Sequence, residues 1–146
     1  MNSSSVPLLT PRDLVEIGRR GAAAPACTNC GELVCPGWES TPSSFDRARL
    51  QRIGMLRQGG DEEATLREHH PRGTHIWSPD APIAPAFFPY NRCDVWQCGR
   101  CGRAFLLYTE YGGYYEDERI RALDSDLVDD DAWRPLGLRS PASSTL

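Results

Sequence analysis

The 146-residue sequence predicts a small α+β fold in which an antiparallel sheet carries short helices along one side. A capped helix start stands at residues 10–13, where a threonine precedes a proline and an acidic residue follows. Residues 103–111 form a strong candidate strand, and the Gly-Gly pair at 112–113 is typical of a two-residue hairpin turn. Two Cys-x-x-Cys-Gly segments, 27–31 and 98–102, each adjoin a predicted strand.

The helix that begins at Pro11 should end at Gly21, because glycine is common just beyond a helix and Arg19 and Arg20 favour its last turn. Gly54 is expected to interrupt a strand. The remaining pattern predicts strands at 32–35, 51–57, 74–77, 92–97 and 114–120, with short helices at 45–50, 61–67 and 124–131.

Residues 78–89 contain four prolines, which exclude a helix and a central strand. We expect an extended segment whose Ile83, Phe87 and Phe88 cover the core.

The chain is expected to form one domain over residues 10–133, because its length suits a single core. Residues 1–9 should be a mobile N-terminus and 134–146 a flexible tail. The part between the two cysteine pairs, about 36–91, is expected to be an insertion packed on the sheet.

The cysteine pairs favour metal binding over disulfides. The sequence has no apolar run long enough to span a membrane and no secretory signal, so a cytoplasmic protein is expected. Thiols stay reduced in the cytoplasm, and paired cysteines there are typically metal ligands. The sequence therefore predicts one structural Zn²⁺ held by Cys27, Cys30, Cys98 and Cys101.

These cysteines give the chain a resemblance to the zinc-ribbon group, in which two knuckles clasp one zinc ion. The 67 residues between Cys30 and Cys98 depart from a minimal ribbon. The segment from Ser78 to Cys93 and the one from Tyr108 to Tyr115 also resemble a set of short bacterial proteins, a resemblance that implies no activity.

The remaining cysteines and the histidines each have two alternative interpretations. Cys35 and Cys93 are interpreted as buried strand residues, with a substitute ligand or a redox pair as the alternative. His69, His70 and His75 are interpreted as loop residues, with a second metal site or a catalytic base as the alternative.

Arg100 and Arg103 flank the second cysteine pair, where they either offset the thiolate charge or contact phosphate.

The predicted hairpin carries a candidate partner-binding surface. Its tyrosines are rigid amphipathic rings suited to protein contacts, and its acidic residues would suit a basic partner. Half-buried strand tyrosines and a charge-protected edge are the alternative interpretation. The candidate residues are Tyr108, Tyr111, Tyr114, Tyr115, Glu116, Asp117 and Glu118.

The composition narrows the range of possible functions. The net charge is −4, which disfavours non-specific nucleic-acid binding. All 16 basic residues are arginines, so Schiff-base chemistry and a Walker-type phosphate loop, which need lysine, are excluded. Four cysteines would fill the zinc shell, which disfavours an enzyme.

The sequence is therefore compatible with three functions. The first is a non-catalytic bacterial zinc protein that binds another protein, for example an inhibitor or immunity protein of a toxin. The second is a nucleic-acid-binding zinc-ribbon accessory factor. The third is a zinc-dependent or thiol enzyme.

Overall fold

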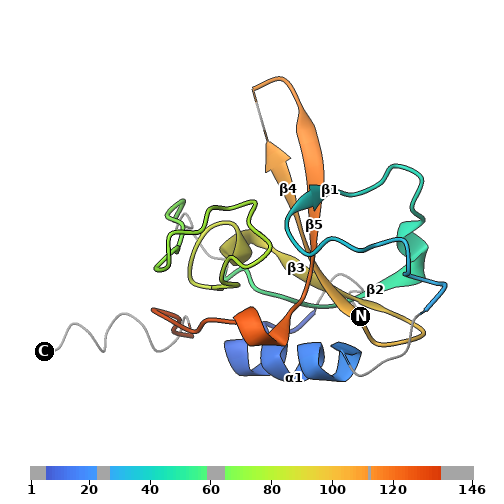
Figure 1. The fold of residues 1–146 in the computed structure, drawn as a ribbon, viewed down its shortest axis with the longest axis horizontal. Helices are drawn as coiled ribbons and strands as arrows, with labels where there is room; N and C mark the ends of the chain where they lie inside the picture. Colours follow the sequence, from blue (N-terminus) through green and yellow to red (C-terminus); the bar gives the residue numbers. More distant parts are fainter. Residues whose placement is uncertain (1–5, 23–26, 59–64, 112, 136–146) are drawn as a thin grey trace, which may run out of the picture.

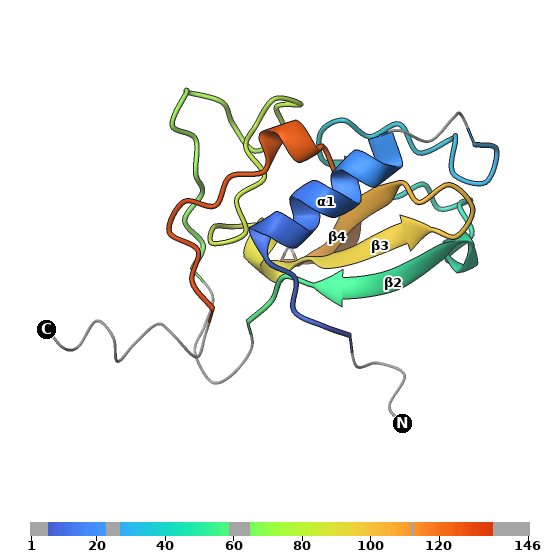
Figure 2. The same cartoon turned by 90° about the horizontal axis from the view of Figure 1, so that it is seen from below.

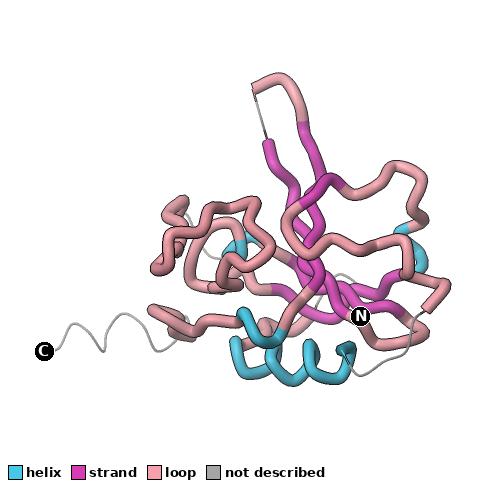
Figure 3. Tube along the Cα trace, in the orientation of Figure 1, coloured by secondary structure: helices cyan, strands magenta, loops and turns pink. Residues whose placement is uncertain are grey.

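The computed structural model describes residues 6–22, 27–58, 65–111 and 113–135. They form an α+β fold with one helix, α1 (Pro11–Ala22), and one five-stranded antiparallel sheet (Figures 1 and 3). Short 3-10 helices lie at Arg47–Arg49, Tyr90–Arg92 and Ser125–Leu127. The sheet has the order β1-β5-β4-β3-β2, and its strands are β1 (Glu39–Ser40), β2 (Leu50–Met55), β3 (Asp94–Cys98), β4 (Ala104–Tyr111) and β5 (Glu116–Ala122).

The predicted start of α1 is confirmed. The Asp13 backbone N–H donates to Thr10 Oγ1 at 3.1 Å, and the Thr10 N–H donates to Asp13 Oδ2 at 2.9 Å, so the two residues satisfy each other as a capping box. Figure 2 shows α1 crossing one face of the sheet, where Leu14 is fully buried.

Gly21 has a different role from the predicted one. The helix continues to Ala22, and Gly21 is buried where a side chain would lie 2.8 Å from Arg103 Cα. The glycine therefore allows close approach of the helix to the chain just after the second cysteine pair.

The central strand β4 is buried on both faces, so each face of the sheet has its own core. Leu106 and Tyr108 point into a cluster that includes Leu14 of α1 and Trp38. Phe105 and Leu107 belong to a second cluster. The second cluster contains cysteines of both Cys-x-x-Cys pairs, so the candidate metal centre rests on one core.

The segment between the cysteine pairs supplies both edge strands. β1 pairs with β5 at one edge, and β2 pairs with β3 at the other. The register of β2 shifts between Arg52 and Gly54, as the predicted interruption at Gly54 requires. A Cβ on Gly54 would lie 2.4 Å from the Leu9 side chain, so the glycine makes room for the N-terminal segment.

The β4–β5 hairpin projects from the sheet (Figure 1), but its predicted turn is wrong. Tyr111 pairs with Glu116, and not with Tyr114 as a two-residue turn would require. Four residues therefore connect the strands. Gly112 itself lies outside the described residues.

Two other predicted strands are wrong. Residues 32–35 and 74–77 form turns and irregular chain. Their backbone is partly satisfied without a ladder: the Cys35 carbonyl accepts a bond from the Ala122 N–H at 2.8 Å, and the Ser78 N–H donates to the His75 carbonyl at 2.9 Å. Of the predicted 61–67 helix, residues 65–67 are not helical, and 61–64 lie outside the described part of the chain.

The proline segment covers the core as predicted. Ile83 is fully buried and forms a parallel bridge to Val128, and Phe87 and Phe88 pack nearby. The predicted helix at 124–131 is reduced to the 3-10 turn Ser125–Leu127, which Asp124 caps through the Asp126 N–H.

Arg121 joins this cover to the sheet. Its side chain on β5 has no solvent exposure and donates hydrogen bonds to the carbonyls of Pro36, Pro79 and Ala81 at 3.0, 3.0 and 2.9 Å and to the Tyr90 hydroxyl. This role could not be predicted from the sequence, because an arginine in a strand near the edge of a sheet usually faces water.

Backbone hydrogen bonds attach the N-terminal segment to β2. The Leu9 N–H donates to the Met55 carbonyl at 2.9 Å, and the Met55 N–H donates to the Pro7 carbonyl at 3.0 Å. At the C-terminal end, the Arg134 carbonyl accepts a bond from Gln58 Nε2 at 2.9 Å. Residues 1–5 and 136–146 of the two predicted terminal segments lie outside the described residues.

Candidate metal centre

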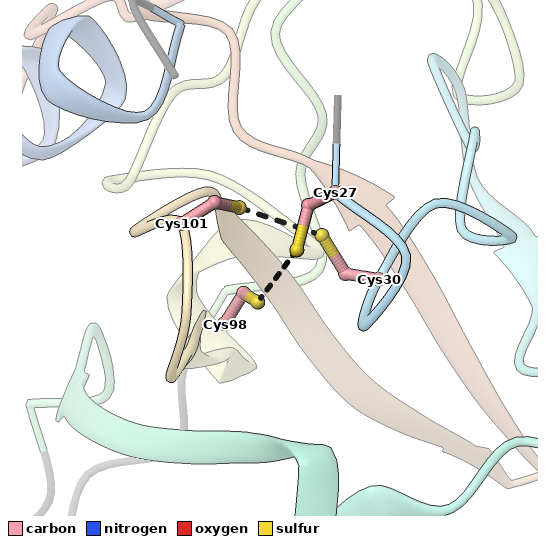
Figure 4. A group of neighbouring side chains, drawn as sticks. All are labelled: Cys27, Cys30, Cys98 and Cys101. Carbon is pink, nitrogen blue, oxygen red and sulfur yellow. Dashed lines mark hydrogen bonds between the residues drawn. The ribbon is translucent and has the colours of Figure 1, made fainter. Parts of the chain in front are cut away.

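The two Cys-x-x-Cys pairs meet at the end of the sheet. Cys98 ends β3, Cys101 lies in the β3–β4 turn, and Cys27 and Cys30 lie in the turn that follows α1 (Figure 4). The four sulfurs lie within 4.8 Å of one another. Among the described residues, no other group of histidines, cysteines and carboxylates converges in this way. The four cysteines together could hold a metal ion.

The sulfur spacing distinguishes a metal site from disulfides. Cys27 Sγ lies 3.8 Å from Cys98 Sγ, and Cys30 Sγ lies 3.6 Å from Cys101 Sγ. A disulfide would bring two sulfurs to about 2.05 Å. Tetrahedral thiolates about 2.3 Å from a zinc ion lie roughly 3.8 Å apart. These two separations are compatible with a metal ion held between the four sulfurs.

The glycine after each pair is required, for two different reasons. Gly102 has φ of +84°, a left-handed conformation that side chains rarely adopt. A Cβ on Gly31 would lie 2.6 Å from the Cys27 carbonyl oxygen. Each glycine lets its turn close tightly enough for both of its cysteines to face one point.

Hydrogen bonds to Cys98 favour its thiolate form. Burial raises the pKa of this thiol, but donation by Asn29 and by the backbone N–H groups of Cys101 and Arg100 outweighs the burial and lowers the pKa to about 6. Asn29 Nδ2 lies 3.1 Å from Cys98 Sγ and also 3.1 Å from the Arg49 carbonyl. Its amide thus links the first knuckle, the sulfur of the second and the 3-10 helix that precedes β2.

Cys30 lies in a more apolar setting. Burial, followed by its contacts with Cys101 and Cys98, raises the pKa of its thiol to about 12. A cation at the centre would reverse that effect, because a thiol that coordinates a metal ion binds as the thiolate and releases its proton to solvent.

Asn29 was missed at the level of sequence. The only signal is a side-chain amide inside a Cys-x-x-Cys turn. Its partner Cys98 lies 69 residues away, so only the tertiary structure shows the contact.

Cys35 and Cys93 do not join the four-cysteine group. They are buried in different hydrophobic clusters, which agrees with their interpretation as buried residues and not as a redox pair. Burial raises the pKa of Cys35 to about 11 and that of Cys93 well above its ordinary value. Both thiols therefore stay protonated and poorly nucleophilic near neutral pH.

The three histidines do not converge on one another. His69 Nε2 lies 3.0 Å from Asp129 Oδ2, and its ring stacks on Phe87 at 4.6 Å. His70 contacts Glu68 and Thr74. His75 is exposed. Their contacts tie loops together, as the loop interpretation predicted.

The arginines beside the second knuckle differ from each other. Arg103 Nη1 donates to the Leu33 carbonyl at 2.7 Å, so it joins the segments that follow the two knuckles. Its guanidinium also lies over Phe105. Arg100 is exposed.

The hairpin residues are divided between core and surface. Tyr108 is buried against Trp38, which corrects its prediction as a partner-binding residue. Tyr111, Tyr114 and Tyr115 are 73%, 104% and 54% exposed. They lie at the end of the projecting hairpin, away from both clusters.

The acidic residues beside these tyrosines are largely engaged. Glu118 pairs with Arg47, and Asp117 pairs with Arg119 at 3.2 Å and accepts a bond from Ser40 at 2.6 Å. Glu116 is exposed.

No described helix is long and apolar enough to cross a lipid bilayer. In comparisons with known proteins, no family model, no curated protein and no solved structure matches this chain.

Proposed function

We propose that this chain is a non-catalytic cytoplasmic protein of bacterial type that binds one structural zinc ion through Cys27, Cys30, Cys98 and Cys101 and acts by binding another protein. Sulfur separations of 3.6 and 3.8 Å between the knuckles support zinc, whose thiolate complexes have this size. Four protein ligands leave no open position, so the ion contributes to folding and not to reaction chemistry.

The observation that carries the binding function is the exposure of Tyr111, Tyr114 and Tyr115 at the tip of a projecting hairpin. Exposed tyrosines cost little conformational entropy to immobilise, and they are enriched at the centres of protein interfaces. An inhibitor of a toxin, such as an immunity protein, is one protein of this kind. The small size, negative net charge and exposed aromatic tip of this chain fit such a role.

Metal content tests the first half of the proposal. Protein purified without chelator should contain one zinc ion per chain by elemental analysis, with none left after Cys27 and Cys98 are both replaced by serine. A full complement of iron, or no metal in the wild-type chain, would contradict the zinc assignment.

Affinity purification from the source cells, with mass spectrometry, tests the second half. The triple variant Tyr111→Ser, Tyr114→Ser, Tyr115→Ser should lose a partner that the wild-type chain retains. The control variant Val34→Ser, Leu66→Ser changes two apolar residues that are each 69% exposed elsewhere, and it should keep the partner. Equal recovery by both variants would remove the hairpin from the binding site.

A further inference from the structure

The side-chain amide of Asn29 joins parts of the chain that are far apart in the sequence. Asn29 Nδ2 lies 3.1 Å from Cys98 Sγ, 69 positions away, and 3.1 Å from the Arg49 carbonyl oxygen, 20 positions away. An asparagine amide nitrogen carries two hydrogens, while a thiolate sulfur and a carbonyl oxygen only accept. Both contacts therefore require the nitrogen, and not the amide oxygen, to face the metal centre.

The N–H donors to the four sulfurs are distributed unequally between the two knuckles. Besides the bond from Asn29, Cys98 Sγ accepts one from the Arg100 N–H, and Cys101 Sγ accepts one from the Arg103 N–H, both at 3.4 Å. These two backbone donors belong to the second knuckle itself. Among the described residues, Asn29 is the one donor that reaches a sulfur from the opposite knuckle.

The position of Asn29 matters because of the charge at the centre. Four thiolates carry more negative charge than one divalent ion neutralises. An N–H donor withdraws part of that charge from the sulfur, and a donor that is already in place loses little freedom when the metal binds. Groups that orient a ligand in this way typically contribute about 10–100-fold to metal affinity.

The second contact of Asn29 holds the amide in place from the other side. Arg49 is the last residue of the 3-10 helix Arg47–Arg49, which leads directly into β2. Its guanidinium also pairs with Glu32, just after the first knuckle, at 3.1 Å. The carbonyl and the side chain of Arg49 thus both contact the first knuckle, so the Asn29 amide is directed at Cys98 by a separate element of the fold.

We infer that Asn29 is a positioning residue of the metal centre, whose amide holds the Cys98 sulfur in place from the opposite knuckle and thereby slows the release of zinc. This inference rests on the proposed zinc site and states what retains the ion there.

The rate of zinc release tests the inference. The zinc-loaded full chain is mixed with an excess of a chromogenic chelator, and the absorbance of the zinc–chelator complex is followed over time. Asn29→Ala should release zinc about tenfold faster than the wild-type chain. Asn29→Asp should release it faster still, because a carboxylate of nearly the same shape replaces the donor by an acceptor that repels the thiolate.

Thr28→Ala is the matched control, because Thr28 is an exposed neighbour in the same turn. Its release rate should equal that of the wild-type chain. Equal rates in Asn29→Ala and Thr28→Ala would overturn the inference. Asn29→Ser, which keeps a polar group in the turn, is measured in the same way if Asn29→Ala fails to fold.

The absorption spectrum after replacement of zinc by Co²⁺ separates positioning of the sulfur from a role in folding alone. The sulfur-to-cobalt charge-transfer band reports the electron density on the thiolates. Loss of the Asn29 donor should move this band to lower energy, whereas Thr28→Ala should leave it unchanged. An unchanged band in Asn29→Ala would overturn the inference, because the amide would then have no effect on the sulfur.

The zinc content of the wild-type chain separates this inference from the proposed function. A wild-type chain that holds one zinc ion, but releases it no more slowly than Asn29→Ala, would leave the zinc site standing and overturn the inference. A wild-type chain without zinc would contradict the zinc site itself.

Discussion

At the residue scale, Cys98 is the member of the candidate metal centre with the most contacts among the described residues. It ends β3, faces Cys27 across the two knuckles and accepts bonds from Asn29 and from the Arg100 N–H. One sulfur thus joins the sheet to both turns. Loss of this sulfur should therefore affect metal binding and folding together.

Cys98→Ser should abolish stable zinc binding and lower the unfolding free energy by more than about 4 kcal/mol, the range typical of a lost structural metal. Denaturant unfolding with parallel zinc analysis measures both effects. Cys93→Ala is the control, because Cys93 is equally buried but lies outside the metal centre. The control should keep its zinc. Unchanged stability and zinc content in Cys98→Ser would refute the assignment.

Arg121 is a second residue on which the stability of the fold depends. It is a fully buried cation without a carboxylate partner among its described hydrogen bonds. Arg121→Met keeps much of the volume but leaves the carbonyls of Pro36, Pro79 and Ala81 without their donors. Relief of the buried charge offsets part of that cost, so we expect a loss of about 3 kcal/mol.

Urea unfolding measures this loss against Arg20→Met, a helix arginine whose side chain is 70% exposed. The control should change stability by less than about 0.5 kcal/mol. Equal effects of the two substitutions would show that the buried hydrogen bonds of Arg121 contribute nothing net.

At the element scale, α1 is positioned by the contact of its last turn with the second knuckle. Gly21 lies where a Cβ would approach Arg103 Cα to 2.8 Å and the Gly102 carbonyl oxygen to 3.1 Å. Both are backbone atoms, which cannot move aside as a flexible side chain would.

The substitution Gly21→Ala has two opposing effects on stability, each of known size. Alanine favours a helix over glycine by up to about 1 kcal/mol. Overpacking against backbone costs about 1–3 kcal/mol. We expect the clash to prevail, with net destabilisation of about 1 kcal/mol in thermal or urea unfolding.

Gly99→Ala is the matched control, because a Cβ there meets nothing within 4 Å. A stabilised Gly21→Ala variant would mean that α1 can shift away from the knuckle without cost.

At the scale of the whole molecule, the four-cysteine site brings together residues that are far apart in the sequence. Cys27 and Cys98 are separated by 71 positions, and the part between them supplies both edge strands. A bound ion would therefore stabilise the sheet as well as its own turns.

Stability should consequently depend on free zinc concentration. If the ion binds the folded chain and not the unfolded one, zinc at a hundred times its dissociation constant should add about 2.7 kcal/mol. Thermal unfolding in zinc buffers of graded concentration measures this dependence. Magnesium at matched ionic strength is the control, because it disfavours thiolate ligands. A melting temperature independent of zinc would contradict a structural role.

The sequence by itself determined the local features. Short-range chemistry is enough to define the capped start of α1, the two Cys-x-x-Cys-Gly turns, the β4 strand and the covering role of the proline segment. In each case the decisive residues lie within a few positions of one another, so their spacing carries the information.

The tertiary structure decided everything that depends on distant partners. In the folded chain Tyr108 is part of the core, whereas Tyr111, Tyr114 and Tyr115 are exposed, because burial depends on which elements cover a strand. It also brought Asn29 to Cys98 and buried Arg121 among three carbonyls. The two cysteine pairs predicted a shared site, but only the fold placed their four sulfurs around one point.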